Sequence, residues 1–427
     1  MILAPALFLF LGCETATGPG AKGAPDDTST PVEGDLPGTT LMGSTSRETA
    51  PSTEHLRALG DANADFSLRL LQGARGLTQG NVVLSPWSLQ LVMAQVYAGA
   101  EGEAKTAIGD TFGWTLGEPD LHEAMDAAEL SMADENDASS DPPVILTSTN
   151  QIFVSTGFDI GAPWLDLLSQ YYGTGVQQID FEADPGGVAD EINAWISTRT
   201  GGHIDDLITT PMVEDSRLLL VNALYFKASW VVPFVEAATA DIPFNLAEGG
   251  AVDVPTMYGS VTVSGAYGDG FVVGDIPYSN SGLTMTLIVP DAGRFEDVAR
   301  TLTWESLAAV IALESRCEEC TVQLPKFKIE GQPPVQAALE AMGMSPAFGG
   351  AYPGIHPDLS LTGVDQAGFI EVNEKGTEAA AATVAEFSDS GGISDFDELI
   401  VDRPFLWMVR DGRTRSVLFA GVVVDPR

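Results

Sequence analysis

The feature that most constrains the fold is a long apolar run in the middle of the chain, RLLLVNALYFKASW at residues 217–230. Such a run is typical of a strand that protein covers on both faces, at the centre of a sheet. With 44% hydrophobic residues among 427, the chain has enough apolar surface to bury a large core around that strand. The sequence therefore predicts a globular protein built around a buried central strand.

The other predicted elements are unevenly distributed. A buried helix is expected after Ser85-Pro86, where a serine cap precedes a proline in the first turn, and another helix at 188–199. Further predicted elements are a strand pair at 144–160, strands at 271–278, 283–290, 321–329, 368–374, 405–410 and 416–424, and helices at 296–313 and 334–343. Because strands and helices do not alternate regularly, the pattern predicts an α+β fold and not a doubly wound one.

The net charge excludes several classes of partner. The chain has 60 acidic and 20 basic residues, which gives a net charge of −40. This charge repels polyanions, so we expect no binding of nucleic acid or of an anionic membrane surface through charge. Residues 119–143 contain no lysine or arginine; they are predicted to form an acidic helix and loop with a solvated face, and they argue against a heparin-like activator.

The N-terminal residues have the composition of a targeting segment. Residues 1–13, MILAPALFLFLGC, are apolar but too few for a membrane-spanning helix, and they are typical of a secretory signal. Gly12-Cys13 resembles a bacterial lipobox, in which Cys13 carries a lipid anchor. Plain secretion and an apolar start without a targeting role stay open. Residues 14–55, rich in Gly, Pro, Thr, Ser and Asp, are predicted to be a disordered tether, so an extracytoplasmic location is expected.

No motif of an enzyme or of a metal site is present. The chain lacks G-x-S-x-G and HExxH. Its four histidines, His55 in the tether, His122 in the acidic helix, and His203 and His356 in turns, are predicted to be surface residues. Cys317 and Cys320 are too few for a zinc site and are predicted to form a minor surface disulfide, their redox state being left open. We therefore expect no catalysis, no cofactor and no metal.

A series of motifs in family order makes residues 58–427 resemble the serpins, the serine protease inhibitors. The motifs are NVVLSPWSL (81–89), YAGAEG (97–102), EINAWISTRTGGHI (191–204), LVNALYFKASWVVPF (220–234), IPYSNSGLTMTLIVP (276–290), VQLPKFKIE (322–330), ALEAMGMSPAF (338–348), RPFLWMV (403–409) and SVLFAGVVVDP (416–426). The resemblance, to a bacterial serpin of inhibitory type, places a serpin domain at 56–427. It implies three β-sheets with about nine helices, an exposed reactive loop, a metastable native state and a monomer.

The resemblance also implies a mechanism. A target protease cuts the reactive loop and forms an acyl-enzyme, and the severed loop then inserts into sheet A as a new strand, which traps the protease covalently. By resemblance, Ser85, Ser88 and Asn222 belong to a shutter where the strands of sheet A part, and Gln366 stands where many members have a histidine. Trp230 and a salt bridge between Lys326 and Glu374 match the top of the sheet, where insertion begins.

The stretch EKGTEAAAATVAEFSDSGG at 374–392 matches the inhibitory hinge of the family. Propensity alone predicts a helix for its alanine tract. As a strand, however, it would place Thr377, Ala379, Ala381, Thr383, Ala385 and Phe387 on one face without a charge. Such a face can slide into a sheet. The predicted hinge residues are Glu374, Lys375, Gly376, Thr377, Glu378, Ala379, Ala380, Ala381, Ala382 and Thr383.

The family's usual spacing from Glu374 predicts the reactive bond at Ser390-Gly391. Counting back from Arg403-Pro404-Phe405 points nearer Ile393. The position of the reactive bond therefore stays undetermined between Ser390 and Ser394. No residue there is Arg or Lys, which argues against a trypsin-like target and favours an elastase-like or subtilisin-like serine protease. Two alternatives stay open: a non-inhibitory serpin acting as a carrier or chaperone, and an inhibitor of a cysteine protease.

Overall fold

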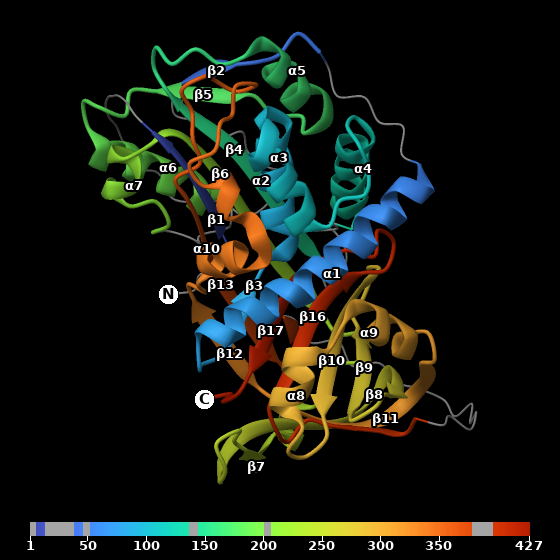
Figure 1. The fold of residues 1–427 in the computed structure, drawn as a ribbon. Coiled ribbons are helices and arrows are strands. Elements are labelled where there is room, and N and C mark those ends of the chain that lie inside the picture. The colour runs from blue at the N-terminus through green and yellow to red at the C-terminus, as the bar shows by residue number, and fades with distance from the viewer. Residues whose placement is uncertain (1–5, 13–37, 46–51, 136–143, 200–205, 378–395) are drawn as a thin grey trace.

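The computed structural model describes residues 6–12, 38–45, 52–135, 144–199, 206–377 and 396–427 (Figure 1). The side chains at 6–12, 147–150, 199 and 222–224 lie outside this description. No helix in these ranges is long and apolar enough to cross a membrane. The predictions for Cys13, His203, Ser390, Gly391 and the hinge residues from Glu378 to Thr383 concern residues that are not described.

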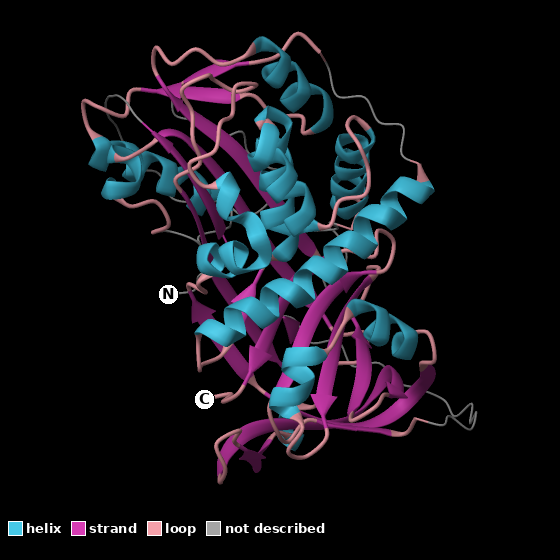
Figure 2. Cartoon of the chain, in the orientation of Figure 1, coloured by secondary structure: helices cyan, strands magenta, loops and turns pink. Residues whose placement is uncertain are grey.

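Ten α-helices lie in the described ranges. They are α1 (Thr53–Leu77), α2 (Pro86–Gly99), α3 (Gly102–Phe112), α4 (Asp120–Ala133), α5 (Ala162–Tyr171), α6 (Pro185–Arg199), α7 (Thr210–Glu214), α8 (Phe295–Thr301), α9 (Trp304–Ile311) and α10 (Val335–Leu339). The predicted cap of α2 is present, because the Ser85 side chain accepts a hydrogen bond from the Ser88 N–H and Pro86 begins the helix. Figure 2 shows most helices gathered beside the upper strands, and α8 and α9 beside the lower ones.

The first sheet, here called sheet A, has eight strands. They are β1 (Ala6–Gly12), β2 (Thr39–Leu41), β4 (Ile145–Ser155), β5 (Val176–Ile179), β6 (Arg217–Ser229), β12 (Phe327–Gly331), β13 (Gly363–Asn373) and β14 (Gly376–Thr377). β6 comes from the long apolar run and is a central strand, antiparallel to β4 on one side and to β1 and β14 on the other. The prediction of a buried central strand is confirmed.

The remaining nine strands form a second set of ladders. They are β3 (Val82–Leu84), β7 (Ala240–Asn245), β8 (Ala251–Tyr267), β9 (Phe271–Pro277), β10 (Leu283–Pro290), β11 (Ser315–Pro325), β15 (Glu398–Ile400), β16 (Phe405–Asp411) and β17 (Val417–Val423). β8 is shared between two groups: it pairs with β7 and β11 along most of its length and with β9 at its end. With sheet A this makes three sheets, and the predicted α+β architecture is confirmed.

Several local predictions are wrong. Residues 145–155 form one strand and not a pair, and Pro325 ends β11 before β12 begins at Phe327. The acidic helix α4 is buried along one side, including His122 and Asp126, so its charges do not indicate a solvated helix. β11 ends at Pro325 because proline has no N–H to donate to a neighbouring strand. The helix α4 is buried because the apolar residues between its acidic ones pack against the core.

The N-terminal region also differs from the predicted tether. Residues 39–41 form β2 at the edge of sheet A, paired with β5, and the Ser44 N–H and hydroxyl donate to the Asp166 carboxylate at 2.5 and 2.8 Å. α1 begins at Thr53, so His55 lies in its first turn. A short polar segment gives no periodic signal, so its pairing with an open sheet edge was not predictable from composition.

Candidate functional site

The candidate site lies where the chain leaves β13 and re-enters sheet A as β14. Gly376 and Thr377 pair with β13 on one side and with Ser229 and Ala228 of β6 on the other. Gly376 has φ +150°, and a Cβ at this position would lie 2.1 Å from the Ala228 carbonyl oxygen, so only glycine fits. The Thr377 side chain is 4% exposed, and its Oγ1 lies 2.6 Å from the Tyr278 hydroxyl.

Glu374 is held by a cluster of donors just before this turn. The Lys326 ammonium lies 3.0 and 2.9 Å from the two carboxylate oxygens, and the Thr239 hydroxyl donates at 2.8 Å. Burial raises the pKa of the Glu374 carboxyl, but the hydrogen bonds from Lys326, from its own backbone and from Thr239 outweigh burial and lower the pKa overall. The predicted pair of Lys326 and Glu374 is therefore formed in the structure.

Trp230, directly after β6, donates two hydrogen bonds to the backbone of the same turn. Its backbone N–H donates to the Lys375 carbonyl at 2.9 Å, and its indole N–H donates to the Asn373 carbonyl at 3.0 Å. The indole stacks on Tyr278, with ring centroids 4.6 Å apart. Burial raises the pKa of Tyr278 far above its ordinary value, although its hydrogen bond with Thr377 opposes this. The Tyr278 hydroxyl is therefore a neutral partner for the hinge.

Tyr278 is a functional candidate that the sequence predictions missed. It lies inside the quoted motif IPYSN, directly after β9, and nothing in its local pattern distinguishes it from a core aromatic residue. Its contact with Thr377 joins residues 99 positions apart. Only the fold brings them together.

The predicted shutter residues Ser85, Ser88 and Gln366 meet below this turn. The Gln366 amide is 1% exposed, accepts from the Ser85 N–H at 2.9 Å and donates to the Ser85 carbonyl at 3.0 Å. The Ser85 hydroxyl lies 2.8 Å from Ser88 Oγ and 2.9 Å from the Leu418 carbonyl oxygen. Both ends of the Gln366 amide therefore bond the backbone of Ser85, which fixes the orientation of the amide.

Asn222 does not adjoin β13 in this structure. Its backbone is paired with Asn150 of β4 and with Leu7 of β1, and Leu7 is also the partner of Gln366. The strand β1 therefore separates the two shutter positions. The sequence placed residues 1–13 in a signal and gave no indication of this pairing.

The far end of the reactive loop is anchored in a different sheet. β15 pairs in parallel with β11, and the Thr321 N–H donates to the Asp397 carbonyl at 3.0 Å. Phe396 is buried. The chain between Thr377 and Phe396, which contains the predicted reactive bond, is thus attached to sheet A at one end and to β11 at the other.

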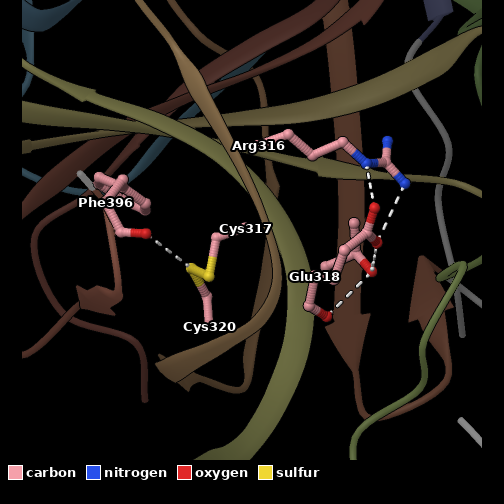
Figure 3. The surroundings of a disulfide bond; sticks show 6 residues. Arg316, Cys317, Glu318, Cys320 and Phe396 are labelled. Carbon is pink, nitrogen blue, oxygen red and sulfur yellow. Dashed lines mark hydrogen bonds and ion pairs between the residues drawn. A yellow bond between two sulfur atoms is a disulfide. The ribbon is translucent and has the colours of Figure 1, made fainter. Parts of the chain in front are cut away.

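Cys317 and Cys320 form a disulfide beside this far anchor (Figure 3). Cys320 is fully buried, with its sulfur 3.6 Å from the Phe396 carbonyl oxygen. The pairing of β11 with β8 shifts register between the two cysteines, while Arg316 and Glu318 form an exposed ion pair. The prediction of a disulfide is confirmed, but its surface position is wrong for Cys320, because the bulge turns this residue inward.

The histidines do not form a catalytic group in the described ranges. His122 is buried and lies 2.7 Å from the Tyr172 hydroxyl and 3.0 Å from Glu118, so its predicted surface position is wrong. His356 packs on the Phe158 ring. His55 comes within 4.8 Å of carboxylates of Asp120 and Glu123, but both lie in the first turn of α4, where the helix dipole disfavours a cation.

The comparisons with known proteins agree with this geometry. A model of the serpin family, described as serine protease inhibitor, matches residues 61–426. Iripin-3 of Ixodes ricinus is 30% identical over 85% of this chain and 93% of its own length, and the leukocyte elastase inhibitor of Bos taurus is 30% identical over 87% and 100%. The native structure of the thermophilic serpin tengpin has a TM-score of 0.73 at 21% identity, covering 90% and 97%. The chain belongs to the serpin family.

Proposed function

We propose that this serpin is an irreversible inhibitor of a serine protease that acts by reactive-loop cleavage and insertion. The observation that carries the proposal is β14, which seats Gly376 and Thr377 between β13 and β6. A strand begun at this point can be continued by the residues that follow once the loop is cut. The chain is cut like a substrate and then holds the protease as a covalent complex. It is not an enzyme, and it needs neither cofactor nor metal.

The reaction needs only the chemistry of the protease. The serine hydroxyl of the protease attacks the carbonyl carbon of the reactive bond, the C–N bond breaks, and an ester joins the loop to the enzyme while the new amine leaves. Insertion of the cut loop then carries the protease away from its starting position. Deacylation by water fails because the distorted protease no longer holds its catalytic groups in place.

The hinge composition supports inhibition over a carrier or chaperone role. The residues predicted to face inward are small and uncharged up to Phe387, and Thr377, the first of them, is already buried. A buried unpaired charge would cost several kcal/mol and slow insertion. The hinge carries no such charge on that face.

The target is an elastase-like or subtilisin-like protease. It cuts this chain at Ser390-Gly391 or up to three bonds downstream. Small residues and the absence of Arg and Lys between Ser388 and Ser394 support this choice, as does the likeness to a leukocyte elastase inhibitor. A cysteine protease, which would form a thioester at the same bond, is the alternative target.

Incubation with a panel of proteases tests the proposal. An inhibitor gives a covalent complex that survives SDS, whereas a carrier gives only cleavage. The matched control is the same protease with its active-site serine blocked beforehand, which should give no complex. Cleavage without complex across serine and cysteine proteases, for the full chain and for a chain lacking residues 2–12 alike, would contradict inhibition.

We further propose that the protein is a monomer held outside the cytoplasm. Gly12-Cys13 supports a lipid anchor at Cys13, and a coil of about 25 residues between Cys13 and the start of β2 would span roughly 28 Å. Mass spectrometry of the membrane fraction should find a lipid on Cys13, and a Cys13→Ala variant should be absent from that fraction. Free secretion is the alternative, and an unmodified wild-type protein in the medium would favour it.

A further inference from the structure

Two separate segments lie between β6 and β13 in sheet A. The strand position between β6 and β13 is here called the slot. β14 lies between these strands at one end, opposite Ala228 and Ser229 of β6. β1 lies between the same strands further along, antiparallel to both, opposite 217–223 of β6 and 363–367 of β13 (Figure 1). The N-terminal segment thus occupies the path along which a strand begun by β14 would continue.

The register makes the overlap specific. In β14, Thr377 is the partner of Ala228 and Val372. Continued in the same antiparallel register, residue 382 comes opposite Ala223 and Ala367, and residue 388 comes opposite Arg217. Those positions are the partners of Ala6 and Gly12 in the structure. The β6 ladder and the β13 ladder independently give the same overlap, so β1 fills the place of residues 382–388.

β1 and the inserted loop exclude one another because each backbone edge accepts one partner. The facing edges of β6 and β13 each present N–H and C=O groups that need hydrogen bonds. β1 satisfies them over seven residues of β6, and Leu7 stands between Asn222 and Gln366, the two shutter positions. While β1 is in place, a cut loop can extend β14 only as far as residue 381.

We propose that residues 6–12 are a removable competitor of the reactive loop, carried by the chain itself. While they are attached, the slot in sheet A is closed and the protein is a poor inhibitor. Cleavage after Gly12, as processing at Cys13 would produce, vacates the slot. This inference rests on the proposed function, because it concerns the slot that the cut loop must enter.

A peptide assay tests the competition without any protease. The probe is a fluorescent peptide with the sequence of residues 377–388, TEAAAATVAEFS, and its uptake is followed on native gels for the full chain and for a chain lacking residues 2–12. If β1 fills the slot in about nine of ten molecules, the full chain should bind the peptide about tenfold more weakly. The truncated chain should also gain thermal stability when it binds the peptide.

A point variant separates the loss of β1 from a general effect of truncation. Leu9→Pro removes a backbone N–H from β1 in the full chain and should raise peptide uptake as truncation does. Ala16→Pro, outside β1, is the matched control and should behave as wild type. Hydrogen exchange should be faster at the amides of 217–223 in Leu9→Pro than in Ala16→Pro.

The outcomes distinguish the two proposals. Equal peptide uptake by the full chain, the truncated chain and Leu9→Pro, with unchanged exchange at 217–223, overturns the competition. Faster uptake after truncation supports it, even where no protease is trapped. Failure to trap any protease in either form overturns the proposed function alone, because peptide uptake measures only the state of the slot.

Discussion

Thr377 shows how one side chain decides between inhibitor and substrate. It is buried against Tyr278 at the start of the insertion path. Thr377→Arg would place a charge at this buried position at a cost of several kcal/mol. Insertion of the loop should then slow, and the protease should hydrolyse the acyl-enzyme before it is trapped. We expect the stoichiometry of inhibition to rise several-fold, measured by titrating the protease with chains lacking residues 2–12.

The neighbouring residue gives the control for this substitution. Glu378→Arg adds the same side chain at the next position, which strand alternation assigns to the opposite face, and should leave the stoichiometry near wild type. Trapping by Thr377→Arg at the wild-type stoichiometry would show that the hinge does not insert in this register.

Glu374 contributes a pH-dependent stabilisation at the same turn. Its pKa is lowered in the folded protein, so its contribution is present above the ordinary carboxyl pKa and is lost as pH falls through the folded value. Glu374→Gln should lower the melting temperature at pH 7 by about 2 °C, for about 1 kcal/mol. The difference from wild type should disappear in acid.

A second carboxylate on β13 provides the comparison. Glu371 pairs with Lys328 at 3.9 Å and is more exposed, so Glu371→Gln should have almost no effect. Equal shifts for the two variants, or a shift for Glu374→Gln that persists at low pH, would contradict the role of the Lys326 pair.

At the scale of elements, the loop between β14 and β15 fixes where a protease can cut. Gly376 and Thr377 pair with β6 and β13, and residues 398–400 pair with β11. The family's usual spacing from Glu374 predicts the reactive bond between these two pairings, nearer the second. Mass spectrometry of the released C-terminal peptide should find a first residue between 391 and 394. A peptide beginning elsewhere would refute this register, and a blocked protease should release none.

The elements most predictable from sequence were those whose own pattern specifies them. The run at 217–230 has apolar residues on both strand faces, and Ser85-Pro86 carries its cap within the motif. The break at Pro325 and the burial of α4 were missed because neighbouring chain segments decide them. Motif resemblance placed Lys326 beside Glu374, but the bond of Gln366 to Ser85 and the contact of Tyr278 with Thr377 depend on long-range packing.

The slot between β6 and β13 was not predictable at all from local pattern. A seven-residue apolar run at the N-terminus is compatible with a signal and with a strand. Its pairing depends on two open edges that exist only in the folded sheet. Under the proposed competition, β1 and residues 382–388 would need the same two edges, so the outcome would depend on the whole molecule and not on either segment alone.

The whole molecule should be metastable, and cutting the loop should show it. Insertion after cleavage would add a central strand with about ten new ladder hydrogen bonds, worth about 1 kcal/mol each. At about 2 °C per kcal/mol, the melting temperature of a chain lacking residues 2–12 should rise by roughly 20 °C after a cut near Ser390. Scanning calorimetry of cut and uncut protein measures this rise.

A nick outside the loop, such as one at 136–143, should give no rise, because it frees no strand to enter sheet A. An unchanged melting temperature after clean loop cleavage would indicate that the loop does not insert, as in a carrier, and that sheet A is already closed without it.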